Sequence, residues 1–157
     1  MIHLKRAGVP QKDMVMLYKC FLVSLLDYAA VVYHPMLTGG QTEELEKLQS
    51  TALKIIFSYE DSYATLLEKS RLDSLEVRRL ALLDKFIIKT ARNPSFGEEW
   101  FPKKTFSHHN LRQELYYEEK YARTNRLYNS LIFFYRLRLN EIDQHDLNKQ
   151  KKDMSTH

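Results

Sequence analysis

Apolar residues recur every three or four positions along most of this chain, and that spacing constrains the fold more than any other feature of the sequence. In the first such run, Lys12 to Tyr33, apolar positions occupy nearly all sides, which is typical of a helix surrounded by other helices. Only four glycines and four prolines occur in 157 residues, which argues against a turn-rich all-β protein. The sequence therefore predicts an all-α protein, an irregular helical bundle of four to six helices with a flexible polar C-terminal tail.

Further helices are expected after the first. Thr38 and Gln41 form a candidate capping box ahead of a second helix, and Gln49 falls in the middle of that helix's apolar stripe. A shorter helix follows, with Asp61 or Ser62 as its cap. The predicted organisation is a helical core bundle over 1–92, a loop or hinge over 93–110, a basic aromatic helical segment over 111–140 and a disordered tail over 141–157.

The helix expected over 73–91, capped by its own acidic residues, places a permanent charge on the face that it buries. At about 100° per residue, Arg79 falls at the centre of the apolar face and Arg78 on its flank. A buried guanidinium needs a partner, so we expect Arg79 to pair with Asp27 or, second, with Glu46. Arg78 is expected to be exposed; the alternative is that both arginines contact nucleic-acid phosphates. The predicted structural polar network is Asp27, Glu46, Gln49 and Arg79.

Basic charge is concentrated late in the chain. Residues 101–140 carry eight Lys and Arg against three Glu, a net charge of +5, whereas the whole chain carries +4. Tyrosines interleave with these cations, and a single-strand binder uses cations for phosphates and flat rings for bases. The alternative is that the tyrosines pack on a core and the cations face solvent. The candidate nucleic-acid contacts are Arg78, Lys103, Lys104, Lys120, Arg123, Arg126 and Tyr128.

Several classes of function find no support in the sequence. It has no glycine-rich phosphate loop, no nucleophile elbow and no metal-ligand spacing, so no catalytic residue, metal or cofactor is predicted. The single cysteine, Cys20, excludes an internal disulfide, lies in an apolar run and is expected to be a buried, inert thiol. No signal peptide is visible, and Lys19 and Asp27 interrupt the most apolar stretch, so we expect an intracellular protein, nuclear or cytoplasmic, without a membrane partner.

Three stretches of the chain carry a family resemblance. In order, "LLDYAAVVYHP", "LEKLQSTALKII" and "SLEVRRLALLDKF" resemble the region just after the polymerase core in jockey-type and related LINE (non-LTR) retrotransposon reverse transcriptases. The matching positions are Asp27, Tyr28, Ala29, Tyr33, Pro35, Leu45, Glu46, Leu48, Gln49, Tyr63, Leu75, Arg78 and Arg79. The later "ARTNRLYNSLIFFYRLRLN" is similar to the closing element of that region. Its matching positions are Thr124, Arg126, Tyr128, Ser130, Leu139 and Asn140.

The match covers roughly residues 4–140, and the order and spacing of the motifs are more specific than any one of them. Two positions depart from the pattern, because the family commonly has Glu where this chain has Asp27 and Trp where it has Tyr33. The resemblance implies a fragment of an RNA-directed DNA polymerase that lacks the metal-binding palm aspartates and is therefore not an enzyme by itself. It implies thumb-like support of the missing upstream palm and contact with RNA or an RNA–DNA hybrid.

Two other functions stay open at the level of sequence. The chain is also compatible with a helical protein-interaction module whose exposed apolar helix face leads to self-association. It is compatible as well with a decayed element fragment that has no independent function, since a chain of this length is expected to be a truncated copy of such an element.

Overall fold

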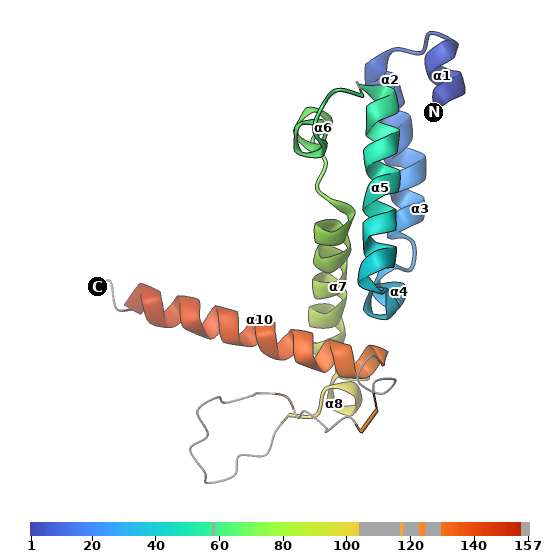
Figure 1. Ribbon diagram of the computed structural model, residues 1–157. Coiled ribbons are helices and arrows are strands. Elements are labelled where there is room, and N and C mark those ends of the chain that lie inside the picture. The colour runs from blue at the N-terminus through green and yellow to red at the C-terminus, as the bar shows by residue number, and fades with distance from the viewer. Residues whose placement is uncertain (58, 104–116, 118–122, 125–129, 155–157) are drawn as a thin grey trace. The chain divides into compact units, whose positions relative to one another are not determined.

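The structure is a computed structural model that describes residues 1–57, 59–103, 117, 123–124 and 130–154, with side chains described as far as residue 143. The chain divides into two compact units, Met1–Leu82 and Leu83–His157. The described residues form helices and no strand, and the one β-type pairing is an isolated bridge between Lys103 and Tyr117. The all-α fold class predicted from the sequence is confirmed (Figure 1).

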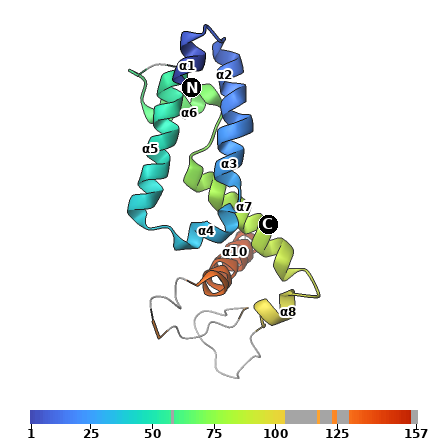
Figure 2. The same cartoon turned by 90° about the vertical axis from the view of Figure 1, so that its right-hand side faces the viewer.

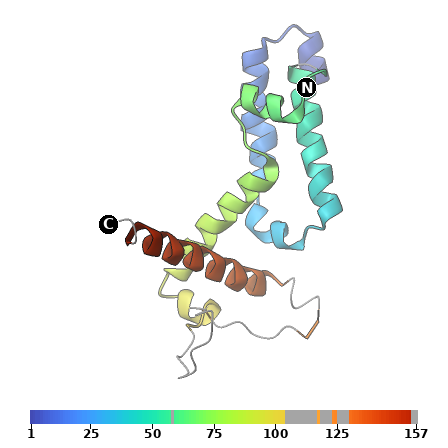
Figure 3. The ribbon, with the colours of Figure 1, turned by 60° about the vertical axis from the view of Figure 1, so that its left-hand side comes forward.

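The first unit consists of a run of short helices, two longer helices and the beginning of α7. Its elements are α1 (Ile2–Arg6), α2 (Gln11–Leu17), the π-helix η1 (Tyr18–Val23), α3 (Ser24–Asp27), α4 (Ala30–Tyr33), the 3₁₀-helix η2 (His34–Met36), α5 (Gly39–Ile56) and α6 (Tyr63–Ser70). The run from α2 to α3 lies beside α5, and α6 crosses them near α2 (Figures 2 and 3). Their core consists of Met14, Tyr18, Val23, Leu53, Ile56 and Leu66.

The single helix predicted from Lys12 to Tyr33 is wrong, because this run is broken. A π-helical segment follows α2, and the chain then turns at Ala29, which has the left-handed backbone angles φ 53° and ψ 19°. The helical stretches Gln11–Asp27 and Ala30–Met36 meet at a bend of 46°. The bend interrupts the helical ladder, and the Tyr33 hydroxyl donates a hydrogen bond to the Leu26 carbonyl beside it.

Helix starts follow local chemistry closely. Thr38 and Gln41 form the predicted capping box, in which each side chain accepts from the other residue's backbone N–H. Of the two caps considered for the next helix, Ser62 is the one that accepts a backbone N–H. The acidic caps expected for 73–91 are wrong, since Ser74 accepts the Val77 N–H at the start of α7 (Leu75–Ala91).

The second unit contains the rest of α7, α8 (Gly97–Trp100) and α10 (Leu131–Met154). The buried apolar residues of this unit are Leu83, Ile87, Phe101, Tyr135 and Leu139. Two contacts join α10 to α7: the Tyr135 ring meets that of Phe86 edge-on at 5.9 Å, and Arg138 holds Asp84 with two hydrogen bonds of 2.8 and 3.0 Å. Both are formed by α10 residues before position 140.

Two predicted segment boundaries differ from those in the structure. The expected hinge over 93–110 contains the short helix α8, and residues 104–110 lie outside the described part of the chain. α10 begins only at Leu131, and it continues to Met154 although its composition turns polar after 140. Polar composition alone therefore did not mark the end of this helix, and residues 155–157 lie outside the description.

Candidate functional site

Arg78, expected to be an exposed bystander, forms the principal ion pair of the first unit. Its Nε donates to both carboxylate oxygens of Asp27, at 2.9 and 2.8 Å, and its Nη2 lies 2.6 Å from Oδ2. The side chains keep 40% and 19% of their surface exposed, so the pair is partly shielded from solvent. Hydrogen bonding to Asp27 raises the pKa of Arg78 still further. This pair ties α3, just before the bend, to the start of α7.

Arg79 is buried as predicted, at 2% exposure, but its predicted pairing is wrong. Its Nε and Nη2 are buried and meet no hydrogen-bond acceptor among the described residues. Adjacent helical residues diverge by about 100°, so only one of the two arginines can face Asp27, and that one is Arg78. Arg79 is close enough to Tyr33 for its charge to oppose the effect of burial, which raises the pKa of that phenol.

The other two predicted network members, Glu46 and Gln49, do lie in a polar network, and two tyrosines complete it. The Oε1 of Gln49, which is 1% exposed, accepts from the Tyr18 hydroxyl at 3.2 Å. Its Nε2 donates to the Tyr63 hydroxyl at 3.1 Å and to the Asp73 carbonyl at 3.0 Å. Every polar atom of this amide that faces the interior is thus satisfied.

The same network reaches the start of α7 through Glu46. Tyr63 donates to Oε2 of Glu46 at 2.5 Å, and Oε1 accepts the backbone N–H of Glu76 at 2.7 Å. A carboxylate suits this position, because the free N–H groups of a helix start favour an anion. Burial raises the pKa of Tyr18 to about 12, and burial together with Glu46 raises the pKa of Tyr63. These phenols therefore stay neutral donors at physiological pH.

The predicted nucleic-acid contacts fall into three groups. Arg78 is occupied by Asp27, whereas Lys103 and Arg123 are exposed. The remaining four lie outside the described residues: Lys104, Lys120, Arg126 and Tyr128. The described residues thus leave two of the seven candidates at an exposed surface.

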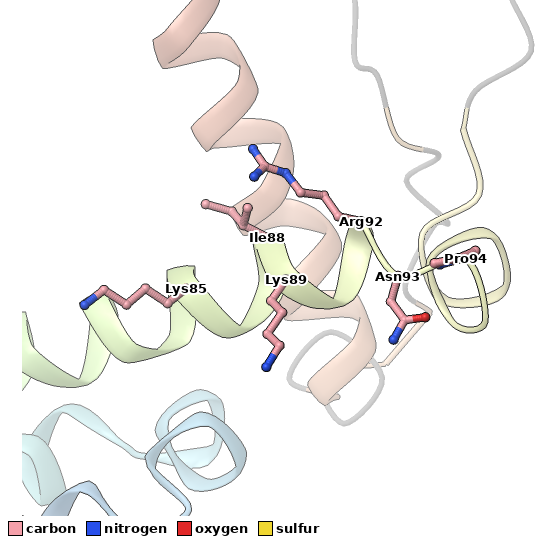
Figure 4. Close-up of a pocket in the computed structure, with 6 residues that line it drawn as sticks. All are labelled: Lys85, Ile88, Lys89, Arg92, Asn93 and Pro94. Carbon is pink, nitrogen blue, oxygen red and sulfur yellow. The ribbon is translucent and has the colours of Figure 1, made fainter.

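The second half of α7 carries a basic hollow that was not predicted from the sequence. Lys85, Ile88, Lys89 and Arg92, with Asn93 and Pro94 beyond the helix, line a space of about 580 Å³. Figure 4 shows Ile88 and Arg92 directed to one side of α7 in that view, Lys89 directed to the other side, and Lys85 directed back along the helix. We call this site the basic hollow.

The three cations of the basic hollow are exposed, and none forms an ion pair with another described residue. A second space of about 440 Å³ shares Arg92 with it and extends to Lys103, with Glu98 as its acidic member. The signal in the sequence was the spacing of Lys85, Lys89 and Arg92 at i, i+4 and i+7, which places three cations on one helical face.

Leu139 and Asn140, which carry the end of the family resemblance, are both buried. The Asn140 amide spans the backbone of Tyr117: its Oδ1 accepts the Tyr117 N–H at 3.0 Å and its Nδ2 donates to the Tyr117 carbonyl at 3.3 Å. The Tyr117 ring in turn meets Phe101 at 6.2 Å, nearly perpendicular to it. Asn140 thus ties the backbone at Tyr117 to α10 within the second unit.

Cys20 is exposed, so the prediction of a buried thiol is wrong. The first helical run packs on one side only, and the π-helical segment that contains Cys20 leaves much of its opposite side uncovered. Among the described residues, no single helix is long and apolar enough to cross a bilayer. The stretches Gln11–Asp27 and Ala30–Met36 reach the necessary length and composition only as a bent pair. Nor do three metal-ligating side chains gather anywhere in the described part of the chain.

Comparison of the chain with models of protein families, with curated proteins and with solved structures gave no match. The family resemblance is therefore carried by the sequence motifs quoted above.

Proposed function

We propose that this chain is a non-catalytic helical module of a non-LTR retrotransposon reverse transcriptase, and that it contacts the phosphates of an RNA–DNA hybrid through the basic hollow. The observation that carries the nucleic-acid contact is the set of three exposed cations on one face of α7 with no carboxylate partner among the described residues. Cations without partners keep their full charge for an external anion. The parent family is inferred from the resemblance.

The spacing of the cations suits a nucleic-acid strand. Lys85 and Arg92 are seven residues apart, which is about 10 Å along a helix axis. One strand of a duplex carries a phosphate about every 3.4 Å of axis, so this face is long enough to neutralise about three phosphates. Ile88 is the apolar residue that lines the hollow among these cations.

Contacts among the motif residues support a module origin. Asp27 and Arg78 come from two of the resembling stretches and pair directly, while Glu46, Gln49 and Tyr63 form one hydrogen-bonded network. Residues at widely separated positions of the resemblance thus form hydrogen bonds that connect the helices of the first unit. The proposed partner is the polymerase palm, whose paired aspartates this sequence lacks; polymerisation is not assigned to this chain.

The nucleic-acid contact is tested by titrating a labelled RNA–DNA hybrid with the full chain at a series of salt concentrations. We expect binding that weakens linearly in log–log form as salt rises. Replacing Lys85, Lys89 and Arg92 with Gln should make the slope shallower by about 2 to 3, since each lost phosphate contact removes about 0.9.

A matched control removes the same charge elsewhere. Gln at Arg6, Lys12 and Lys47, which are exposed and belong to the first unit, also lowers the net charge from +4 to +1. The control should change the salt slope by less than half as much as the triple substitution in the basic hollow. Equal effects of the two triples would assign binding to net charge alone. Absence of binding, or binding insensitive to salt, would refute the proposed contact.

A further inference from the structure

A second hollow lies next to the basic hollow, at the C-terminal end of α7. Its volume is about 440 Å³, which is within the range of small-ligand sites, and Arg92, Asn93 and Pro94 line both spaces. The buried ring of Phe101 forms part of its wall, and Glu98 is its acidic residue. A ligand that extends from the basic hollow past Arg92 therefore meets a carboxylate next.

Close packing of α8 on the end of α7 fixes where Glu98 lies. The preceding residue, Gly97, is buried, and its backbone N–H donates to the Asn93 carbonyl at 2.7 Å. A Cβ built on Gly97 would lie 2.4 Å from the Ala91 carbonyl oxygen, an approach that only glycine permits. The backbone that carries Glu98 is thereby held close to the end of α7 and to Arg92.

The Glu98 carboxylate is exposed and available to a ligand. In the part of the chain that the structure describes, its side chain forms no hydrogen bond or ion pair. A carboxylate accepts hydrogen bonds and donates none, so it can bind only a ligand group that carries a donor. It also repels phosphate oxygens, so a site for phosphates alone would gain nothing from it.

The backbone of a nucleic-acid duplex offers such a donor only in RNA. Phosphate oxygens and the sugar ring oxygen accept hydrogen bonds, and the donors of paired bases face the grooves rather than the backbone. The 2′-hydroxyl of ribose can donate, and deoxyribose lacks it. We propose that Glu98 accepts a hydrogen bond from the 2′-hydroxyl of the strand whose phosphate contacts Arg92, so that the site selects the RNA strand of a hybrid. This inference rests on the proposed phosphate contact and names the strand that makes it.

Binding of the full chain to two RNA–DNA hybrids of one sequence tests the proposal. One hybrid has an ordinary RNA strand. In the other, fluorine replaces each 2′-hydroxyl of that strand, which keeps the sugar pucker of RNA and removes the O–H donor. At one salt concentration, we expect the fluorinated hybrid to bind about 10-fold more weakly, as for the loss of one hydrogen bond to a charged group. The salt slope should be equal for both hybrids, because their phosphates are the same.

Two variants of α8 identify the residue that distinguishes the hybrids. Glu98→Ala removes the acceptor and should bring the two affinities within about two-fold of each other. Glu99→Ala is the matched control, because Glu99 is an exposed residue of the same helix with the same charge and is not among the described residues that line the second hollow. The control should keep the preference for the ordinary RNA strand, and circular dichroism verifies that both variants keep their helices.

The outcomes separate this inference from the proposed function. Salt-dependent binding of equal strength to the two hybrids would overturn the role of Glu98 and leave the phosphate contact standing. A preference that persists in Glu98→Ala, or that is lost in Glu99→Ala, would also overturn it. Absence of binding to both hybrids would overturn both proposals.

Discussion

Arg78 and Arg79 are neighbours in sequence, and the same substitution at the two positions should change stability in opposite directions. Arg78 holds Asp27 with two hydrogen bonds from Nε and a 2.6 Å contact from Nη2. Arg79 is 2% exposed, and two of its nitrogens have no acceptor among the described residues. Methionine suits both sites, because it keeps an unbranched stem and removes the charge.

The expected changes in the free energy of unfolding follow from how deeply each arginine is buried and from whether its N–H donors have acceptors. Each buried donor without an acceptor costs about 1–3 kcal/mol, so Arg79→Met removes two such penalties at the cost of some packing. We expect Arg79→Met to raise the free energy of unfolding by about 2 kcal/mol. Arg78→Met leaves Asp27, only 19% exposed, without its partner. Exposed pairs contribute about 0.2–1 kcal/mol and breaking a buried pair costs about 3–5, so a loss of about 1–2 kcal/mol suits this intermediate exposure.

Urea unfolding of the full chain, followed by far-ultraviolet circular dichroism, measures both effects, and equal m-values show that the compared states are alike. Asp27→Asn combined with Arg78→Met should be less destabilising than the sum of the two single changes, by about 1 kcal/mol. A loss of more than about 1 kcal/mol for Arg79→Met would refute the reasoning, because it would show that the guanidinium has an acceptor in solution.

Three further changes test the network and the bend. Gln49→Leu should cost about 2 kcal/mol in urea unfolding, because it strips the acceptor from Tyr18, and Tyr18→Phe should relieve part of that cost. Ala29→Gly should stabilise by about 1 kcal/mol, since glycine adopts φ 53° without a steric penalty, whereas Ala52→Gly inside α5 should destabilise by a similar amount. The raised pKa values of Tyr18, about 12, and of Tyr63 mean that the folded state holds their protons more tightly. Their contribution to stability is therefore complete below pH 10; that of Tyr18 is lost as pH rises through about 12, and that of Tyr63 is lost as pH rises through its own raised pKa. Tyrosinate absorbance and unfolding measured in parallel test this.

Local chemistry was predictable from the sequence where a short-range interaction decides it. The capping box of Thr38 and Gln41 needs residues only three apart, and it forms as expected. The burial of Arg79 and of Gln49 followed from helical periodicity, which fixes the face of a residue whatever that face meets. Periodicity also gave the all-α class, because few glycines and prolines interrupt it.

Pairings and breaks were not predictable, because they depend on residues far apart in the chain. From the sequence, Asp27 could pair with either arginine of α7. Adjacent helical residues point about 100° apart, and in the structure Arg78 is the one that faces Asp27. The turn at Ala29 has no glycine or proline to announce it, and its left-handed backbone is held by contacts such as that between Tyr33 and Leu26. The π-helical segment Tyr18–Val23 changes the helical phase ahead of this turn, so Val23 is buried while Phe21 and Leu25 are exposed.

The residues that resemble the reverse transcriptase region and the residues proposed to bind phosphate are different sets, and this difference has a consequence. The side chains of Arg78, Gln49 and Asn140 each form hydrogen bonds with another residue of the fold. These contacts account for the three polar residues without any ligand. Lys85 and Lys89 form no ion pair with another described residue. Changes at Arg78, Gln49 and Asn140 should therefore lower stability and weaken hybrid binding only through unfolding, whereas changes at Lys85 and Lys89 should weaken binding at unchanged stability. A motif position whose substitution abolished binding in a fully folded chain would break this separation.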